Sequence, residues 1–144
     1  MNWLHESAGP VAVLDPQTVA NTAKLSAAVD MSKFHQVTFV FLLGDMANET
    51  IDAGVYESDA SGGTYTALSG KQATQLAAGA SANDNKQIVI TVRSEELSSG
   101  KRYLKGRLIT GGATGGVACI VAYAQPRFGP ATDDKAAGVV QVIV

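Results

Sequence analysis

Acidic side chains form the densest group of residues in this chain that could do acid–base chemistry. Glu49, Asp52, Glu57 and Asp59 lie within one short stretch of sequence. A pair of carboxylates held near a substrate can serve as general acid and general base. Apolar and polar residues alternate around Asp52, which puts it on the polar face of a strand. We therefore predict that the group is solvated charge and not a catalytic pair.

Metal ligands of the nitrogen and sulfur type are scarce. His5 and His35 are the two histidines, and neither has a histidine three or four residues away. Cys119 is the one cysteine and sits in the apolar run Val117 to Tyr123, which predicts a buried, inert thiol. Tetrahedral zinc needs four such ligands, so we expect no metal site.

Oxygen-rich and glycine-rich segments also lack the spacing that their chemistry requires. Asn83 to Asn85 and Asp133-Asp134 do not follow the spaced calcium-loop pattern. Gly111 to Gly116, GGATGG, contains no lysine and lies between two predicted strands, so it is not a phosphate-binding loop. No serine stands in a GxSxG elbow. We predict no catalytic residue, no cofactor and no enzymatic activity.

Short runs with a period of two must position these residues. A period of two sends alternate side chains to opposite faces, and runs of this length bounded by turn formers indicate strands of a sandwich or barrel. The clearest runs are Val37 to Leu43, Thr50 to Glu57, Lys86 to Arg93, Arg102 to Thr110, Val117 to Tyr123 and Val139 to Val144. We predict an all-β, single-domain antiparallel β-sandwich, jelly-roll-like, with about eight strands and extended N- and C-terminal segments.

Three segments carry more detailed expectations. Val37 to Leu43 has apolar residues at both odd and even positions, which predicts a central strand covered on both faces. Gly111 to Gly116 is expected to be a hairpin loop between its neighbouring strands. Ser69 to Asn85 has little periodicity and is expected to be a long loop.

The two ends of the chain are the candidate contact sites. Residues 1–10 form the expected N-terminal arm, and residues 11–144 the sandwich domain. The last six residues, VVQVIV, have high β-propensity and no charge, so they must pair inside the sandwich or in a neighbouring subunit. The predicted subunit or capsid contacts are Trp3, Leu4, His5, Val140, Val142 and Val144.

Composition narrows the class of partner. The chain has 144 residues, of which 46% are hydrophobic and 17% charged, and its net charge is −2. So little charge is typical of a surface that is partly covered, and without a basic stripe we expect no nucleic acid. The N-terminus has no basic segment followed by an apolar core, and the longest apolar stretch is far shorter than the ~20 residues that span a bilayer. We expect no secretory signal, no membrane partner and synthesis in a cytoplasm.

Five collinear segments carry a resemblance to a known family. The chain resembles small head-associated proteins of tailed bacteriophages, the decoration or cement proteins that stabilise capsids. The segments are Ala28 to Gly44, Thr50 to Gly70, Asn83 to Arg93, Ser99 to Gly112 and Ala122 to Pro130.

The resemblance implies a jelly-roll-like sandwich that binds the outer surface of an assembled shell. The implied partner is the major capsid protein, the implied oligomer a homotrimer, and the implied location the capsid exterior of a virion made in a host bacterial cytoplasm. Such proteins have no active site.

Two other functions remain open from the residues alone. A tail or neck component of a virion would show similar strands and exchanged termini. A carbohydrate-binding sandwich would need exposed aromatic side chains, for which Tyr56, Tyr65 and Tyr103 are the candidates.

Overall fold

The computed structural model of the chain describes residues 7–79, 81–128 and 140–141. These residues form nine strands and one short 3-10 helix, η1 (Ser94–Glu96). The strands are β1 (Gly9–Val19), β2 (Lys24–Leu25), β3 (Val29–Asp30), β4 (Phe34–Met46), β5 (Ile51–Ser58), β6 (Thr66–Gln72), β7 (Gln87–Arg93), β8 (Tyr103–Thr110) and β9 (Gly116–Pro126). The prediction of an all-β fold is confirmed.

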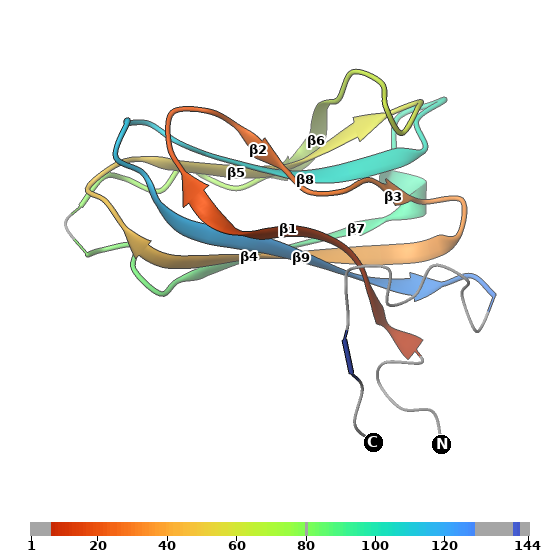
Figure 1. Cartoon of the computed structure of the whole chain (residues 1–144). Coiled ribbons are helices and arrows are strands. Elements are labelled where there is room, and N and C mark those ends of the chain that lie inside the picture. The colour runs from red at the N-terminus through yellow and green to blue at the C-terminus, as the bar shows by residue number, and fades with distance from the viewer. Residues whose placement is uncertain (1–6, 80, 129–139, 142–144) are drawn as a thin grey trace.

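The strands form two antiparallel sheets that pack face to face (Figure 1). Sheet A has the order β1-β9-β4-β7, and sheet B has the order β2-β8-β5-β6, with β3 also paired to β8. Because β2 and β3 both pair with β8, they occupy one strand position, and the sandwich has eight positions. That order is the jelly-roll order, which agrees with the predicted fold.

The core lies between the sheets and is built by alternation. In β4 the side chains of Phe39 and Phe41 are fully buried, as are Leu104 and Leu108 of β8 in the facing sheet. Gly106 lies between these two leucines, where an added Cβ would come within 3.1 Å of Phe39 and of Ile120. The missing side chain therefore makes room for the aromatic ring of the opposite sheet.

The glycine-rich loop Gly111 to Gly116 is not a hairpin loop, and that prediction was wrong. It joins β8 of sheet B to β9 of sheet A, so it crosses between the layers. The Glu49 carboxylate fixes it by accepting hydrogen bonds from the N–H groups of Thr114 (2.9 Å) and Gly115 (3.0 Å). Gly115 has a φ of +63°, and a Cβ there would collide with the Val19 carbonyl, so this position requires glycine.

Two predicted boundaries also move. β1 begins at Gly9, so Gly9 and Pro10 of the expected arm are already paired with β9. Pro10 is tolerated because β1 is an edge strand, where one row of N–H groups has no ladder partner. β6 extends to Gln72, so the first four residues of the expected loop Ser69 to Asn85 belong to a strand.

No helix among the described residues has the length and apolar character that crossing a membrane would need.

Candidate functional site

The four acidic side chains are not brought together into a catalytic pair. Asp52 accepts two hydrogen bonds from the Gln75 amide, at 2.9 and 3.0 Å. Glu57 is 3% exposed and accepts a 2.9 Å bond from the Ser98 N–H, so the prediction of solvated charge was wrong for this residue. Glu49 fixes the crossing loop as described. Burial is the largest single effect on the Glu49 pKa and raises it, but the hydrogen bonds from Thr110 and from the loop N–H groups together outweigh burial, so the pKa is lowered.

The oxygen-rich loop before β7 has a structural role. Asp84 accepts a 2.8 Å bond from the Met46 N–H, and the Asn83 amide donates to the Ala77 carbonyl at 3.0 Å. His35 is exposed at the start of β4. Within the described part of the chain, no three histidine, cysteine or acidic side chains gather into a group that could hold a metal ion.

Cys119 lies on the outer face of β9 and is half-buried, not fully buried as predicted. Its register partner on β4 is Leu42. Burial raises the pKa of the thiol, which keeps it protonated and weakly nucleophilic at neutral pH.

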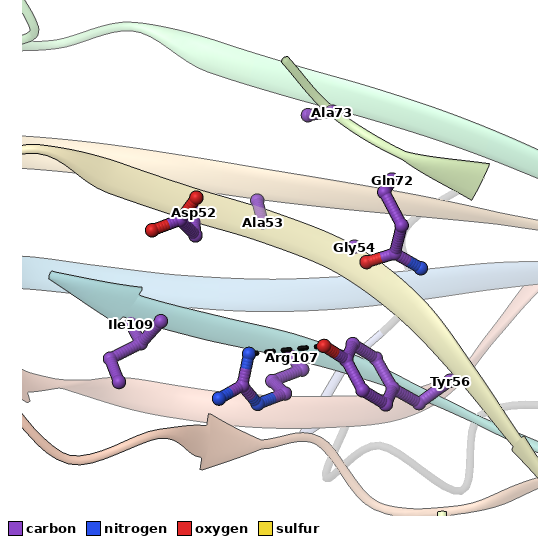
Figure 2. Close-up of a pocket in the computed structure, with 8 residues that line it drawn as sticks. All are labelled: Asp52, Ala53, Gly54, Tyr56, Gln72, Ala73, Arg107 and Ile109. Atoms are coloured by element: carbon purple, nitrogen blue, oxygen red, sulfur yellow. Dashed lines mark hydrogen bonds between the residues drawn. The ribbon is translucent and has the colours of Figure 1, made fainter. Parts of the chain in front are cut away.

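The outer face of sheet B is polar. A shallow hollow of about 360 Å³ lies on β5, β6 and β8 and is lined by Asp52, Ala53, Gly54, Tyr56, Gln72, Ala73, Arg107 and Ile109 (Figure 2). Arg107 donates a 3.1 Å hydrogen bond to the Tyr56 hydroxyl, and the Gln72 amide donates to the Val55 carbonyl at 2.7 Å. These polar groups therefore bond to one another.

A cation stacks on each tyrosine that a sugar platform would use. The Arg107 guanidinium lies 5.1 Å from the Tyr56 ring centroid and the Lys105 ammonium lies 4.7 Å from that of Tyr65. Arg102 lies 5.3 Å from the Tyr103 ring. A sugar stacking on those ring faces would have to displace a favourably placed charge.

The outer face of sheet A has the opposite character. Its central row runs across all four strands in the register Val13, Val121, Val40, Val89. Directly opposed residues of antiparallel strands share a face, so these four valines form one apolar row. We call it the valine row.

The rows on either side of the valine row extend the uncharged surface. One contains Tyr123, Thr38 and Thr91, and the other contains Cys119, Leu42 and Gln87. Val89, Val117 and Tyr123 on this face are 59%, 49% and 44% exposed. On β9, β4 and β7 these three rows contain no charged side chain, which distinguishes this part of the molecule from the outer face of sheet B.

Strand Val37 to Leu43 was expected to be covered on both faces, and the described residues cover it on one. Val37, Phe39, Phe41 and Leu43 are buried, whereas Val40 and Leu42 are half-buried on the outer face. Apolar residues at both odd and even positions therefore indicate a central strand, and the rest of the described chain leaves the second face of this strand open.

Most of the terminal contact residues lie outside the described part of the chain. These are Trp3, Leu4, His5, Val142 and Val144. Val140 is described and is 99% exposed. The structure thus brings none of its described residues against Val140.

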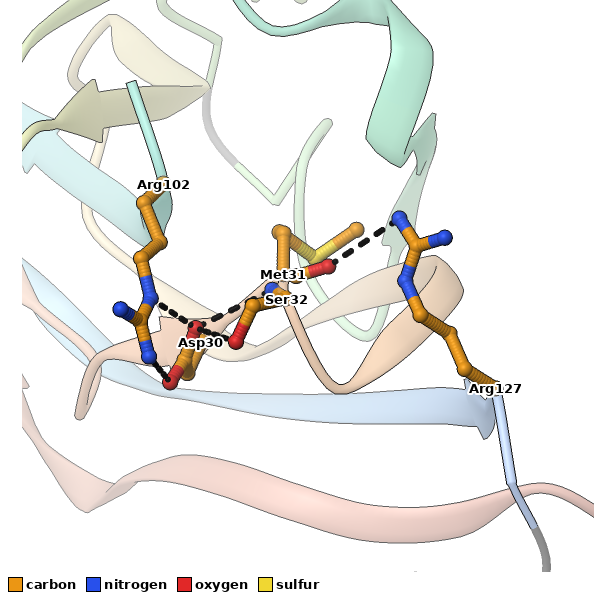
Figure 3. Close-up of polar contacts among 5 residues, drawn as sticks. All are labelled: Asp30, Met31, Ser32, Arg102 and Arg127. Carbon is orange, nitrogen blue, oxygen red and sulfur yellow. Dashed lines mark hydrogen bonds and ion pairs between the residues drawn. The ribbon is translucent and has the colours of Figure 1, made fainter. Parts of the chain in front are cut away.

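An ion pair ties the turn after β3 to the start of β8 (Figure 3). Arg102 donates to both oxygens of Asp30, at 2.7 and 2.6 Å, and Ser32 donates its N–H and hydroxyl to the same carboxylate. The bond from Arg102 lowers the Asp30 pKa most, burial raises it, and the bonds from Ser32 lower it further. The pKa falls from 3.8 to about 2. Arg127 nearby donates weakly to the Met31 carbonyl, at 3.5 Å.

We expect Asp30→Asn to flatten the acid dependence of stability. The folded-state pKa is lower than the unfolded one, so the unfolded chain binds more protons between these values. The contribution of Asp30 is complete above pH 3.8 and is lost as the pH falls toward 2. Urea unfolding at pH 6 and at pH 3 should therefore show a smaller difference for Asp30→Asn than for the wild type. Asp15→Asn, an exposed acid on β1, is the control, and an equal flattening by both variants would contradict this assignment.

The candidate surface that the sequence analysis missed is the outer face of sheet A. Its signal was the second set of apolar residues in three runs, Val40 and Leu42, Val89, and Val117 with Val121. The expectation of a strand covered on both faces concerned only Val40 and Leu42.

Comparisons with known proteins give only distant likenesses. No family model and no curated protein match the chain. A solved structure described as a Bacillus endospore appendage, from a family of disulfide-linked pili, is similar at 18% identity with a TM-score of 0.47, over 88% of this chain and 96% of that one. The K1 cleaved adhesin domain of Lys-gingipain from Porphyromonas gingivalis W83 is similar at 16% identity with a TM-score of 0.42, over 74% of this chain and 63% of that one. Likenesses this distant do not indicate what the chain binds.

Proposed function

We propose that this chain is a non-enzymatic structural protein of a tailed-phage virion, which binds the outer surface of the assembled capsid and stabilises contacts between capsomers. Its partner is the major capsid protein, and it acts as a homotrimer on the capsid exterior. The observation that carries the proposal is the valine row on the outer face of sheet A, together with its uncharged neighbouring rows on β9, β4 and β7. The resemblance of five collinear segments to capsid decoration proteins supports the choice of the capsid as partner.

The two faces of the sandwich suit a protein that lies between a surface and water. Burial of apolar surface contributes about 25 cal/mol per Å², so contact with the shell through sheet A removes the valine row from water. The tyrosines and cations of sheet B are satisfied among themselves and remain solvated. In the proposed complex, sheet A therefore faces the shell and sheet B faces water.

Selective binding to one state of the shell is enough for stabilisation. A ligand that binds the assembled, expanded lattice and not its alternatives shifts the equilibrium toward that lattice by mass action. Many copies, each adding a modest free energy, make the whole shell resistant to internal pressure. A non-enzymatic role agrees with the acidic residues, since Glu49, Asp52 and Glu57 each bond to a neighbouring segment.

Co-sedimentation tests the proposal. Purified protein is mixed with expanded heads and with unexpanded shells of the phage that encodes it, and bound copies are counted per capsid protein. We expect saturable binding to expanded heads alone. Equal binding to both shells would contradict selective stabilisation, and binding to isolated tails or necks but not heads would replace the capsid with the tail as the partner. Binding to a glycan array with none to virion parts would favour the carbohydrate alternative.

A further inference from the structure

Among the described strands, β7 forms an edge of sheet A. It ends the strand order β1-β9-β4-β7 and pairs only with β4 in the sheet. The Lys86 carbonyl, just before β7, accepts from the Leu43 N–H of β4, whereas the Thr91 carbonyl accepts from Lys71 of β6 at 2.8 Å. Even-numbered residues of this segment therefore direct their backbone groups toward β4 and odd-numbered residues direct theirs outward.

The outward groups along β7 are only partly used. Lys71 occupies the Thr91 carbonyl, and the Glu96 carboxylate accepts from the Arg93 N–H at 2.7 Å. Gln87 and Val89 lie on the same outward row, and no bond from the described residues reaches their outward N–H and C=O groups. This free stretch is the kind of exposed edge to which another strand adds.

A groove runs beside this free stretch. It has a volume of about 330 Å³ and lies between the end of β6 and β7, lined by Gly70, Lys71, Gln72, Ala73, Ile88, Val89, Ile90 and Thr91. Ile88 and Ile90 point toward the core but stay half-buried, because none of the described strands closes the sandwich at this edge. Added apolar side chains here would complete their burial.

We propose that the C-terminal segment 139–144, VVQVIV, of one copy adds as an antiparallel or parallel strand to the β7 edge of a second copy. The segment has six residues and no charged side chain, and β7 has seven residues. Its alternation places Val140, Val142 and Val144 on one face and Val139, Gln141 and Ile143 on the other. The all-valine face covers Ile88 and Ile90, and the face that contains Gln141 continues the outer surface of sheet A beyond Val89.

We assign the segment to a second copy because its two described residues lie exposed on their own chain. Val140 is 99% exposed and Gln141 is also exposed. A strand of such composition left in water invites intermolecular pairing. Head-to-tail donation of one strand per copy closes into a ring, which is compatible with a trimer. The inference concerns contacts between copies and does not rest on the proposal of capsid binding.

Proline at Val89 provides a selective block of the edge. The Val89 N–H points outward, so Val89→Pro removes a donor from the free edge and none from the ladder to β4. Gln87→Pro, on the same outward row, serves the same purpose if Val89→Pro fails to fold. Circular dichroism and thermal melting check the fold of each variant.

The inference is tested by mixing a variant that keeps only the donor strand with one that keeps only the acceptor edge, and by measuring their association in sedimentation velocity. The full chain should sediment as an oligomer, and both the chain truncated after Gly138 and the full-length Val89→Pro variant should sediment as monomers. The truncated chain keeps the acceptor edge and the proline variant keeps the donor strand, so an equimolar mixture should form a one-to-one heterodimer. A truncated Val89→Pro chain mixed with either should stay monomeric.

Two results would overturn the inference. If the full chain and the truncated chain have the same oligomeric state, the segment does not join copies. If truncation and Val89→Pro each abolish the oligomer but the mixture does not associate, the segment does not add to the β7 edge. A full chain that is monomeric and loses melting temperature on truncation would place the segment on its own sandwich.

Discussion

Phe39→Ala should lower the free energy of unfolding by about 3–5 kcal/mol, the usual cost of removing a buried aromatic side chain. Phe39 is fully buried on the central strand β4 and meets the facing sheet at Gly106. The cost arises from lost burial and from the cavity that a rigid sandwich cannot close. Urea unfolding followed by circular dichroism measures this loss of stability. Val117→Ala, on the exposed face of β9, is the control and should change stability by less than about 0.5 kcal/mol.

A double-mutant cycle assigns the effect to the contact between the sheets. In the wild type, a Cβ at Gly106 comes within 3.1 Å of Phe39 and of Ile120, so Gly106→Ala forces these neighbours apart. In the Phe39→Ala background the new methyl group enters the vacated space, and we expect Gly106→Ala to be less destabilising there. Contacting pairs couple by about 0.5–3 kcal/mol. Strictly additive effects, or a loss below about 1 kcal/mol for Phe39→Ala, would contradict the packing described for this core.

The sandwich itself could be predicted because its signal is local. Alternation along Ile51 to Val55 and along Leu104 to Leu108 reports which face of each strand is buried, and burial drives the pairing of sheets. The β5–β6 hairpin likewise follows from a glycine-containing loop between two short runs. The residue types of a turn and the period of a strand are both local signals, so they can be recognised in a single sequence.

Strand partners could not be predicted in the same way. Gly111 to Gly116 has the composition of a hairpin loop, yet β8 and β9 belong to different sheets. The choice depends on the register of β9 between β1 and β4, which involves residues about a hundred positions apart. Glycine permits either geometry and therefore does not decide between them.

The candidate site was predictable only in part. The sequence predicts no catalytic group and indicates the termini as the candidate surface. The described residues add a second candidate surface, the outer face of sheet A. Val40 and Leu42 carried the signal. An apolar residue on a strand looks the same in sequence whether its own chain or a partner covers it.

Val121→Lys should weaken binding to expanded heads by about 100- to 4000-fold if sheet A contacts the shell. Val121 lies inside the valine row, with Val13 and Val40 as its register partners. A buried charge without a partner costs about 3–5 kcal/mol, and each 1.4 kcal/mol is tenfold in affinity. Binding isotherms from co-sedimentation measure the change, and melting temperatures verify that the variant is folded.

Ile109→Lys is the matched control, because it makes the same kind of change on the opposite outer face. Ile109 is half-buried on β8, and its register partner Asp52 would stand opposite the new ammonium group. We expect its affinity for heads to stay within about twofold of the wild type, since opposite charges across a strand pair are mildly stabilising. If Ile109→Lys loses affinity for heads and Val121→Lys does not, the contact face is sheet B and not sheet A. If neither variant loses affinity for heads, both lysines remain in water when the sandwich is bound. Neither outer face is then the contact, and the contact must lie at the termini.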